Sequence, residues 1–155
     1  MNKKTQSKIA ALRSSLDEAD MFLGAAATDE DRRILEAKCL SELQAILPKQ
    51  YLDFLGVYDG LMSGGVCLYS SRPHTFREGE GYSHALVEHN LIARDLEVMS
   101  GFLIFGESDT DIYVLDVASQ TFQVRDRQAI DNVFEEFQCF DELLEFMIDL
   151  IISRA

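Results

Sequence analysis

The sequence lacks the cysteine pattern of a disulfide framework or a zinc site. Its three cysteines, Cys39, Cys67 and Cys139, are far apart, and none belongs to a CxxC pair. No apolar run approaches the roughly 20 residues of a membrane span. No apolar core follows the basic start at residues 1–7, so we expect no secretory signal peptide. These absences predict a cytoplasmic protein without disulfides, membrane insertion or a cofactor.

Basic residues are scarce after residue 50. The 155 residues include 14 basic and 27 acidic side chains, which give a formal net charge of -13. Residues 1–50 contain 8 of each kind, whereas residues 51–155 contain 6 basic and 19 acidic side chains. Such a surface repels the phosphate backbone of nucleic acids. It attracts basic proteins and speeds their association at low salt, although excess acid also keeps proteins soluble without any binding role.

A chain of this length is one domain, and it is large enough to bury about 68–70% of its unfolded surface without a metal or a disulfide. We expect residues 28–155 to form the core and residues 1–27 to form a helical extension. Hydrophobic periodicity predicts a first helix over residues 5–22. A second helix begins after the N-cap Thr28 and is expected to bury Ile46 near its end.

Three β-rich runs form the centre of the predicted fold, at residues 102–105, 112–115 and 121–125. Short polar connectors separate them, which predicts an antiparallel meander. In the first two runs both the odd and the even positions are apolar, as in central strands that are covered on both faces. The third run alternates, which indicates an outer strand. With a further strand at 66–69, the order of elements predicts an α+β fold. Its mostly antiparallel sheet has about four to six strands flanked by helices.

The segments around these strands carry weaker signals. Residues 70–82 mix proline, glycine and charge, which predicts a surface loop. Ser83 can cap a helix of about a dozen residues. Phenylalanines anchor an irregular segment at residues 133–140, and Asp141 begins a final amphipathic helix.

Candidate catalytic groups are few. The cysteines lie in apolar surroundings, where a buried thiol is usually inert. His84 and His89 are five residues apart, which does not place them on one helix face. Asp109 and Asp111 would share a face of an extended strand, and such a pair could hold a divalent cation with a phosphate substrate. No glycine-rich phosphate loop accompanies them, and turns favour Asp for local hydrogen bonds. We therefore expect a non-enzymatic protein, with a small divalent-metal enzyme as an alternative.

Acidic residues cluster at the predicted strand connections and before the last helix. The residues that we expect to bind a basic partner are Glu107, Asp109, Asp111, Asp116, Glu135 and Glu136. The alternative interpretation of these residues is a solvated rim of charge.

Three motifs follow one another at a defined spacing. They are Leu47-Pro48-x-x-Tyr51-x-x-Phe54-Leu55-x-x-x-Asp59-Gly60, Ile104-Phe105-Gly106-x-x-x-x-Asp111-x-Tyr113-x-Leu115-Asp116 and Phe140-x-x-Leu143-Leu144. In this order they resemble the SUKH superfamily over residues 40–150. That superfamily groups the fungal cell-wall-synthesis regulators with many bacterial toxin-immunity proteins. Its usual Asn-Gly-Gly is Asp59-Gly60-Leu61 in this sequence.

The resemblance implies a non-enzymatic α+β domain that binds other proteins. Bacterial members commonly neutralise a toxin, often a nuclease, made by the same cell. A nuclease must hold polyphosphate, so its cleft is basic, and an acidic surface can block that cleft by charge complementarity. We therefore hypothesise an immunity protein directed at a basic toxin. A regulatory or scaffold module acting on a cell-wall or housekeeping partner is the alternative.

Overall fold

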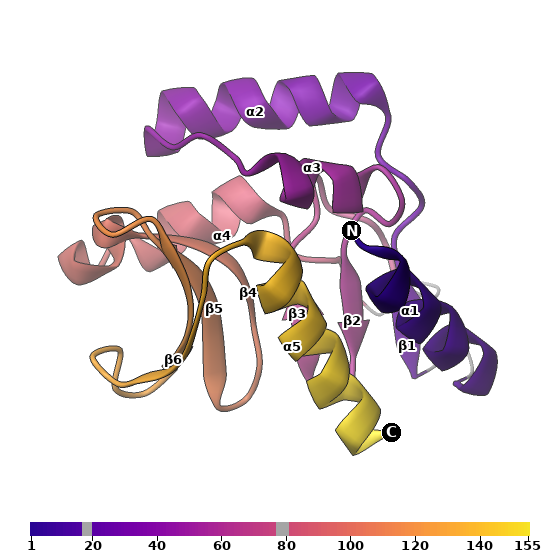
Figure 1. Cartoon of the computed structure of the whole chain (residues 1–155). Helices are drawn as coiled ribbons and strands as arrows, with labels where there is room; N and C mark the ends of the chain where they lie inside the picture. The colour runs from indigo at the N-terminus through magenta and orange to yellow at the C-terminus, as the bar shows by residue number, and fades with distance from the viewer. Residues whose placement is uncertain (17–19, 77–80) are drawn as a thin grey trace.

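A computed structural model describes residues 1–16, 20–76 and 81–155. Within these ranges the chain forms one seven-stranded antiparallel sheet in which the strands lie side by side in sequence order. Five α-helices surround it, and α5 crosses in front of the sheet (Figure 1). The predicted α+β class is therefore confirmed, with one strand more than the expected four to six.

The strands are short at the start of the chain and longer towards its end. They are β1 (Met21–Leu23), β2 (Leu61–Ser63), β3 (Val66–Leu68), β4 (Phe102–Glu107), β5 (Asp111–Asp116), β6 (Thr121–Asp126) and β7 (Val133–Phe137). The helices are α1 (Lys3–Ser15), α2 (Asp29–Leu43), α3 (Lys49–Leu55), α4 (Leu86–Ala93), the 3₁₀ helix η2 (Glu97–Gly101) and α5 (Phe140–Arg154). Helices therefore interrupt the first half of the sheet, whereas short connections join β4 to β7.

The core lies between the sheet and the helices α3 and α5. Phe140, the first residue of α5, has its ring centroid 5.2 Å from that of Phe105 and 5.3 Å from that of Tyr51. All three side chains are fully buried. Burying each side chain of this size contributes about 1.5–3 kcal/mol, so these rings fix α5 on the central strands.

A buried asparagine attaches α4 to the sheet. The side-chain oxygen of Asn90 accepts a hydrogen bond from the backbone N–H of Ile104, and its side-chain nitrogen donates to the Ile104 carbonyl, both at 2.8 Å. The helix begins at Leu86 rather than after the predicted cap Ser83. The Ser83 hydroxyl instead contacts the loop before α4, where it accepts a hydrogen bond from the N–H of His74 at 2.8 Å.

The start of the chain differs from the predicted helix over residues 5–22. Helix α1 ends at Ser15, and Met21–Leu23 form the edge strand β1, which pairs with β2. Pairing with β2 overrides the local helical pattern. Residues 1–27 thus contribute both α1 and β1, and α1 buries Ile9 and Leu12. Residues 17–19 lie outside the described ranges.

The far edge of the sheet also differs from the prediction. The segment predicted to be irregular contains strand β7, which makes β6 an inner strand instead of an outer one. Phe122, Gln123 and Val124 of β6 are accordingly buried. Phe134 is an extra residue in the pairing, because Val124 lies opposite Glu135 and Arg125 lies opposite Val133. This bulge breaks the alternation that would have revealed the strand.

Helix α2 begins as predicted and ends earlier. Thr28 and Asp31 form a reciprocal capping box at its start. The helix stops at Leu43, where Gln44 takes a left-handed conformation. Ile46 lies beyond this end and is 81% exposed, so its predicted burial is wrong.

Candidate functional site

Two of the predicted acidic residues lie at the β4–β5 connection, and each faces an arginine. Glu107 Oε2 lies 3.5 Å from Nη2 of Arg127, and Asp109 Oδ1 lies 2.9 Å from Nη2 of Arg154. The hydrogen bond from Arg154 lowers the pKa of the exposed Asp109 carboxyl. These two carboxylates are therefore already partly compensated by charges of the chain itself.

Asp111 does not share a strand face with Asp109 as predicted, because Asp109 lies in the turn and β5 begins at Asp111. The carboxylate of Asp111 accepts a long hydrogen bond, 3.5 Å, from the hydroxyl of Tyr113. Across the sheet Asp111 lies opposite Asp126 of β6. The expected geometry for a shared divalent cation between Asp109 and Asp111 is thus not present.

Asp116 lies at the other end of β5 from Asp111. At about 3.3–3.4 Å per residue the two Cα atoms are about 17 Å apart. The carboxylate of Asp116 accepts a hydrogen bond from the N–H of Ala118 at 3.1 Å and lies 3.7 Å from Nη2 of Arg125. The fold therefore separates Asp116 from the acids at the β4–β5 connection.

Glu135 and Glu136 lie on the edge strand β7, and both are exposed. They are opposite Val124 and Gln123 of β6, so their side chains point to opposite faces of the sheet. Among residues 1–16, 20–76 and 81–155, neither takes part in an ion pair. The bulged Phe134 beside them is 52% exposed. Within the part of the chain that the structure describes, this strand combines uncompensated carboxylates, an exposed aromatic ring and a sheet edge without a neighbour.

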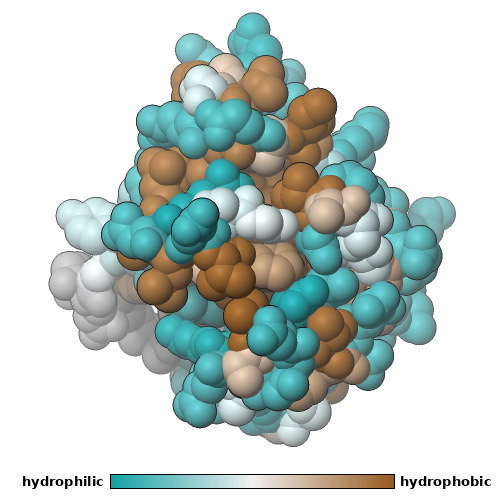
Figure 2. All heavy atoms as spheres, turned by 90° about the vertical axis from the view of Figure 1, so that its left-hand side faces the viewer, coloured by the Kyte–Doolittle hydropathy of each residue, from teal (hydrophilic) through white to brown (hydrophobic). Residues whose placement is uncertain are grey.

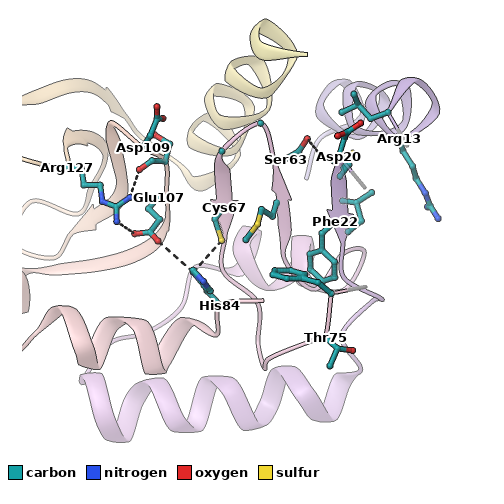
Figure 3. Close-up of a pocket in the computed structure, with 18 residues that line it drawn as sticks. Arg13, Asp20, Phe22, Ser63, Cys67, Thr75, His84, Glu107, Asp109 and Arg127 are labelled. Carbon is teal, nitrogen blue, oxygen red and sulfur yellow. Dashed lines mark hydrogen bonds and ion pairs between the residues drawn. The ribbon is translucent and has the colours of Figure 1, made fainter. Parts of the chain in front are cut away.

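A cavity of about 1000 Å³ lies on the face of the sheet turned away from α5. Its apolar floor is a cross-strand row, in which Phe22 lies opposite Met62 and Met62 lies opposite Cys67. Figure 3 shows its polar end, where Glu107 lies between His84 and Arg127. Sequence reasoning missed this cavity because its lining residues come from distant segments.

Cys67 and Glu107 both approach the same ring nitrogen of His84. Nδ1 lies 3.9 Å from the Cys67 sulfur and 3.8 Å from Glu107 Oε1. A relay that activates a thiol needs the thiol and the orienting acid on opposite ring nitrogens of the histidine, which acts as the base. Burial also raises the pKa of the Cys67 thiol to about 12. The arrangement thus lacks an activated nucleophile.

The rings of His84 and His89 touch, with centroids 4.1 Å apart in an edge-to-face contact. His84 precedes α4 and His89 lies within it, so the chain turn, rather than a shared helix face, brings them together. Burial, and then the neighbouring His84, lowers the pKa of His89. Within the described ranges, no group of three or more His, Cys, Asp or Glu side chains is arranged to hold a metal ion.

A buried carboxylate fixes the loop after β3. Asp59 is fully buried and accepts hydrogen bonds from the N–H and the hydroxyl of Ser71 at 2.6 and 2.7 Å. Its Oδ2 also lies 2.6 Å from Nε2 of His74. In the sequence, Asp59 belongs to the motif that ends at Gly60, and nothing there predicts its contacts with Ser71 and His74. The structure shows that it holds the described part of the predicted loop at 70–82.

Comparison of the sequence with protein-family models and with curated proteins finds no match. Among the residues that the structure describes, every helix is too short or too polar to cross a lipid bilayer.

Proposed function

We propose that this chain is a non-enzymatic, cytoplasmic protein-binding module, namely an immunity protein that neutralises a basic, nuclease-type toxin. The SUKH resemblance of residues 40–150 and the net charge of -13 support this function. The observation that carries it is the edge strand β7, where Glu135 and Glu136 are exposed beside the half-exposed Phe134.

The six predicted acidic residues are not equivalent for binding. A basic partner that docks on Glu107, Asp109 or Asp116 has to compete with Arg127, Arg154 or Arg125. At Glu135 and Glu136 it meets carboxylates that pair with no basic side chain among the described residues. Phe134 offers an aromatic anchor of the kind that is enriched at protein interfaces. The acidic surface of residues 51–155 adds long-range attraction that speeds the encounter.

The test begins with the partner. A pull-down from the native cell, followed by identification of the bound protein, supplies a candidate whose nuclease or growth-inhibiting activity is then measured. We expect a basic protein whose activity is lost when it is mixed with this chain. A toxin gene beside the gene that encodes this chain would also support the immunity function. A housekeeping or cell-wall partner that keeps its activity would instead support the regulatory or scaffold function.

The binding surface is tested with two variants of equal charge. The double variant Glu135→Lys/Glu136→Lys should slow association with the basic partner by about tenfold at low salt, because it removes the complementary charge. The control Glu36→Lys/Glu42→Lys changes two exposed residues of α2 by the same total charge. Equal slowing in the two variants would refute β7 as the docking site and leave only general steering.

A further inference from the structure

Exposed apolar side chains gather where α4 and η2 meet. Ile92, Leu96 and Val98 are 65%, 68% and 56% exposed. Val117 lies in the β5–β6 connection, and its exposure is 39%. We call these four residues the α4–η2 surface. Between them lie Asp95 and Glu97, both exposed.

Three hydrogen bonds hold this surface in place. The Arg94 guanidinium donates to the carbonyl of Leu43 at 2.9 Å and to the carbonyl of Phe102 at 3.2 Å, which ties α4 to the end of α2 and to the start of β4. The N–H of Val117 donates to the Gly101 carbonyl at 3.0 Å, which places Val117 next to η2. The apolar side chains are therefore presented on a fixed backbone.

The core does not require these residues to be apolar. Met99, within the same turn as Leu96 and Val98, supplies the contact of η2 with the core and is 8% exposed. Figure 2 shows the side of the molecule to which the end of α4 and η2 extend in Figure 1, and hydrophobic residues gather there in groups among hydrophilic ones. Single exposed apolar residues are ordinary, but connected ones mark interaction surfaces.

We propose that the α4–η2 surface docks a cationic amphipathic helix of a partner protein. Ile92 lies in the last turn of α4 and Leu96 directly precedes η2, so the two short helices together offer apolar contacts to the apolar stripe of such a helix. Asp95 and Glu97 are placed to meet lysines or arginines that flank that stripe. A second copy of this chain would bring the same carboxylates and another net charge of -13 against them, so self-association is disfavoured. The inference concerns a different surface from β7 and stands independently of toxin binding there.

The first experiment uses a designed helical peptide of leucine and lysine, about 18 residues long so that it forms a stable helix on binding. Titration into the ¹⁵N-labelled full chain should shift amide resonances at residues 91–98, Gly101 and Val117 with saturation. A scrambled peptide of the same composition has the same charge but no apolar stripe. We expect it to bind about tenfold more weakly. Equal affinity of the two peptides, or shifts confined to other residues, would overturn the proposal.

The second experiment changes the surface itself. Leu96→Ser with Ile92→Ser should weaken peptide binding about tenfold, because it removes two apolar contacts. The control Ile34→Ser removes an apolar side chain of similar exposure, 58%, from α2 and should leave binding unchanged. Urea unfolding of each variant verifies that it is folded. Equal losses in both would show that any exposed apolar residue suffices and would contradict the proposal.

A variant at Gly101 can obstruct the α4–η2 surface without removing any of its apolar side chains. A Cβ added at this exposed residue meets no atom within 4 Å. Gly101→Gln should therefore fold normally while its side chain obstructs the docked helix and weakens peptide binding several-fold. Unchanged affinity would place the helix elsewhere. Loss of peptide binding here, with toxin binding retained, separates this proposal from the function assigned to β7.

Discussion

The guanidinium carbon of Arg125 on β6 lies 4.5 Å from the ring centroid of Phe102 on β4. The guanidinium thus reaches across β5 on the face of the sheet turned away from α5. Its Nε donates to the side-chain oxygen of Gln123 at 2.8 Å, and Nη1 donates to the carbonyl of Ile130 at 2.7 Å. The side chain is 12% exposed. One arginine therefore joins two strands and the β6–β7 connection.

We expect Arg125→Lys to lower the free energy of unfolding by about 1–3 kcal/mol. Lysine keeps the charge but cannot provide the planar set of donors that reaches Gln123 and Ile130 together. Urea denaturation at pH 7 measures the change. The control Arg13→Lys, on the exposed part of α1, should stay within about 0.5 kcal/mol. A loss no larger than that of the control would mean that the charge alone matters.

Asp59→Ala should lower the free energy of unfolding by about 3 kcal/mol. The substitution leaves the donors of Ser71 and His74 without their buried acceptor. Asp53→Ala is the matched control, because that carboxylate is 43% exposed and pairs with the exposed Lys49, so about 0–1 kcal/mol is expected. Thermal unfolding of both variants measures the two losses of stability. A stable Asp59→Ala protein would contradict a structural role for this network.

Substitution by alanine should change the free energy of unfolding in opposite directions at two glycines. A Cβ at Gly106 would lie 2.2 Å from the Cys67 carbonyl oxygen, so one of the paired strands β3 and β4 has to move. Gly106→Ala is therefore expected to cost about 2–3 kcal/mol. Gly101→Ala meets open space and should be neutral or stabilising by up to about 1 kcal/mol. Chemical denaturation of the pair measures both effects, and a tolerated Gly106→Ala would argue against the β3–β4 register.

Stability should fall as the pH drops from 7 towards 5, and His89 should contribute to that fall. Burial, followed by His84, lowers the pKa of His89 below its usual value of 6.5, although Glu107 and Glu88 oppose this. Above pH 6.5 the imidazole is neutral in both states. Below it, the unfolded chain takes up a proton that the folded chain does not, so unfolding is favoured until the folded pKa is reached.

The variant His89→Gln should show a flatter dependence of the unfolding free energy between pH 5 and 7. Carboxyl groups with lowered pKa values, such as Asp31 and Glu145, lose their stabilising charge at lower pH, below about 4.5, so their contribution is separate. Urea midpoints at half-unit pH steps provide the measurement. An identical slope in the wild type and the variant would exclude His89 as the source.

The sequence predicted the middle of the sheet better than its edges. Strands β4, β5 and β6 are each six residues long in the structure, which is enough for a pattern to stand out. Strands β1 and β2 are three residues each, and their pairing depends on contacts between residues 21–23 and 61–63. In β7 the bulge at Phe134 and the exposure of the strand remove the alternation. Short or bulged edge strands are set by tertiary contacts that no local pattern records.

The acidic residues were identified from the sequence, but their electrostatic partners were not. Arg154 lies 45 residues from Asp109, and only the fold brings α5 to the β4–β5 turn. The separation of Asp111 from Asp116 follows directly from strand length once β5 is recognised. The cavity beside Cys67 and His84 depends on the pairing of β1, β2 and β3. It therefore shares the unpredictability of those strands.

The sequential strand order also bears on how the chain folds. Strands β4 to β7 pair through short connections, so their contacts are local and close with little loss of chain entropy. Joining β1 to β2 requires residues 24–60, with helices α2 and α3, to be organised first. We therefore expect the meander β4–β7 to form the folding nucleus. We expect β1, at the opposite edge of the sheet, to be added last and to detach first.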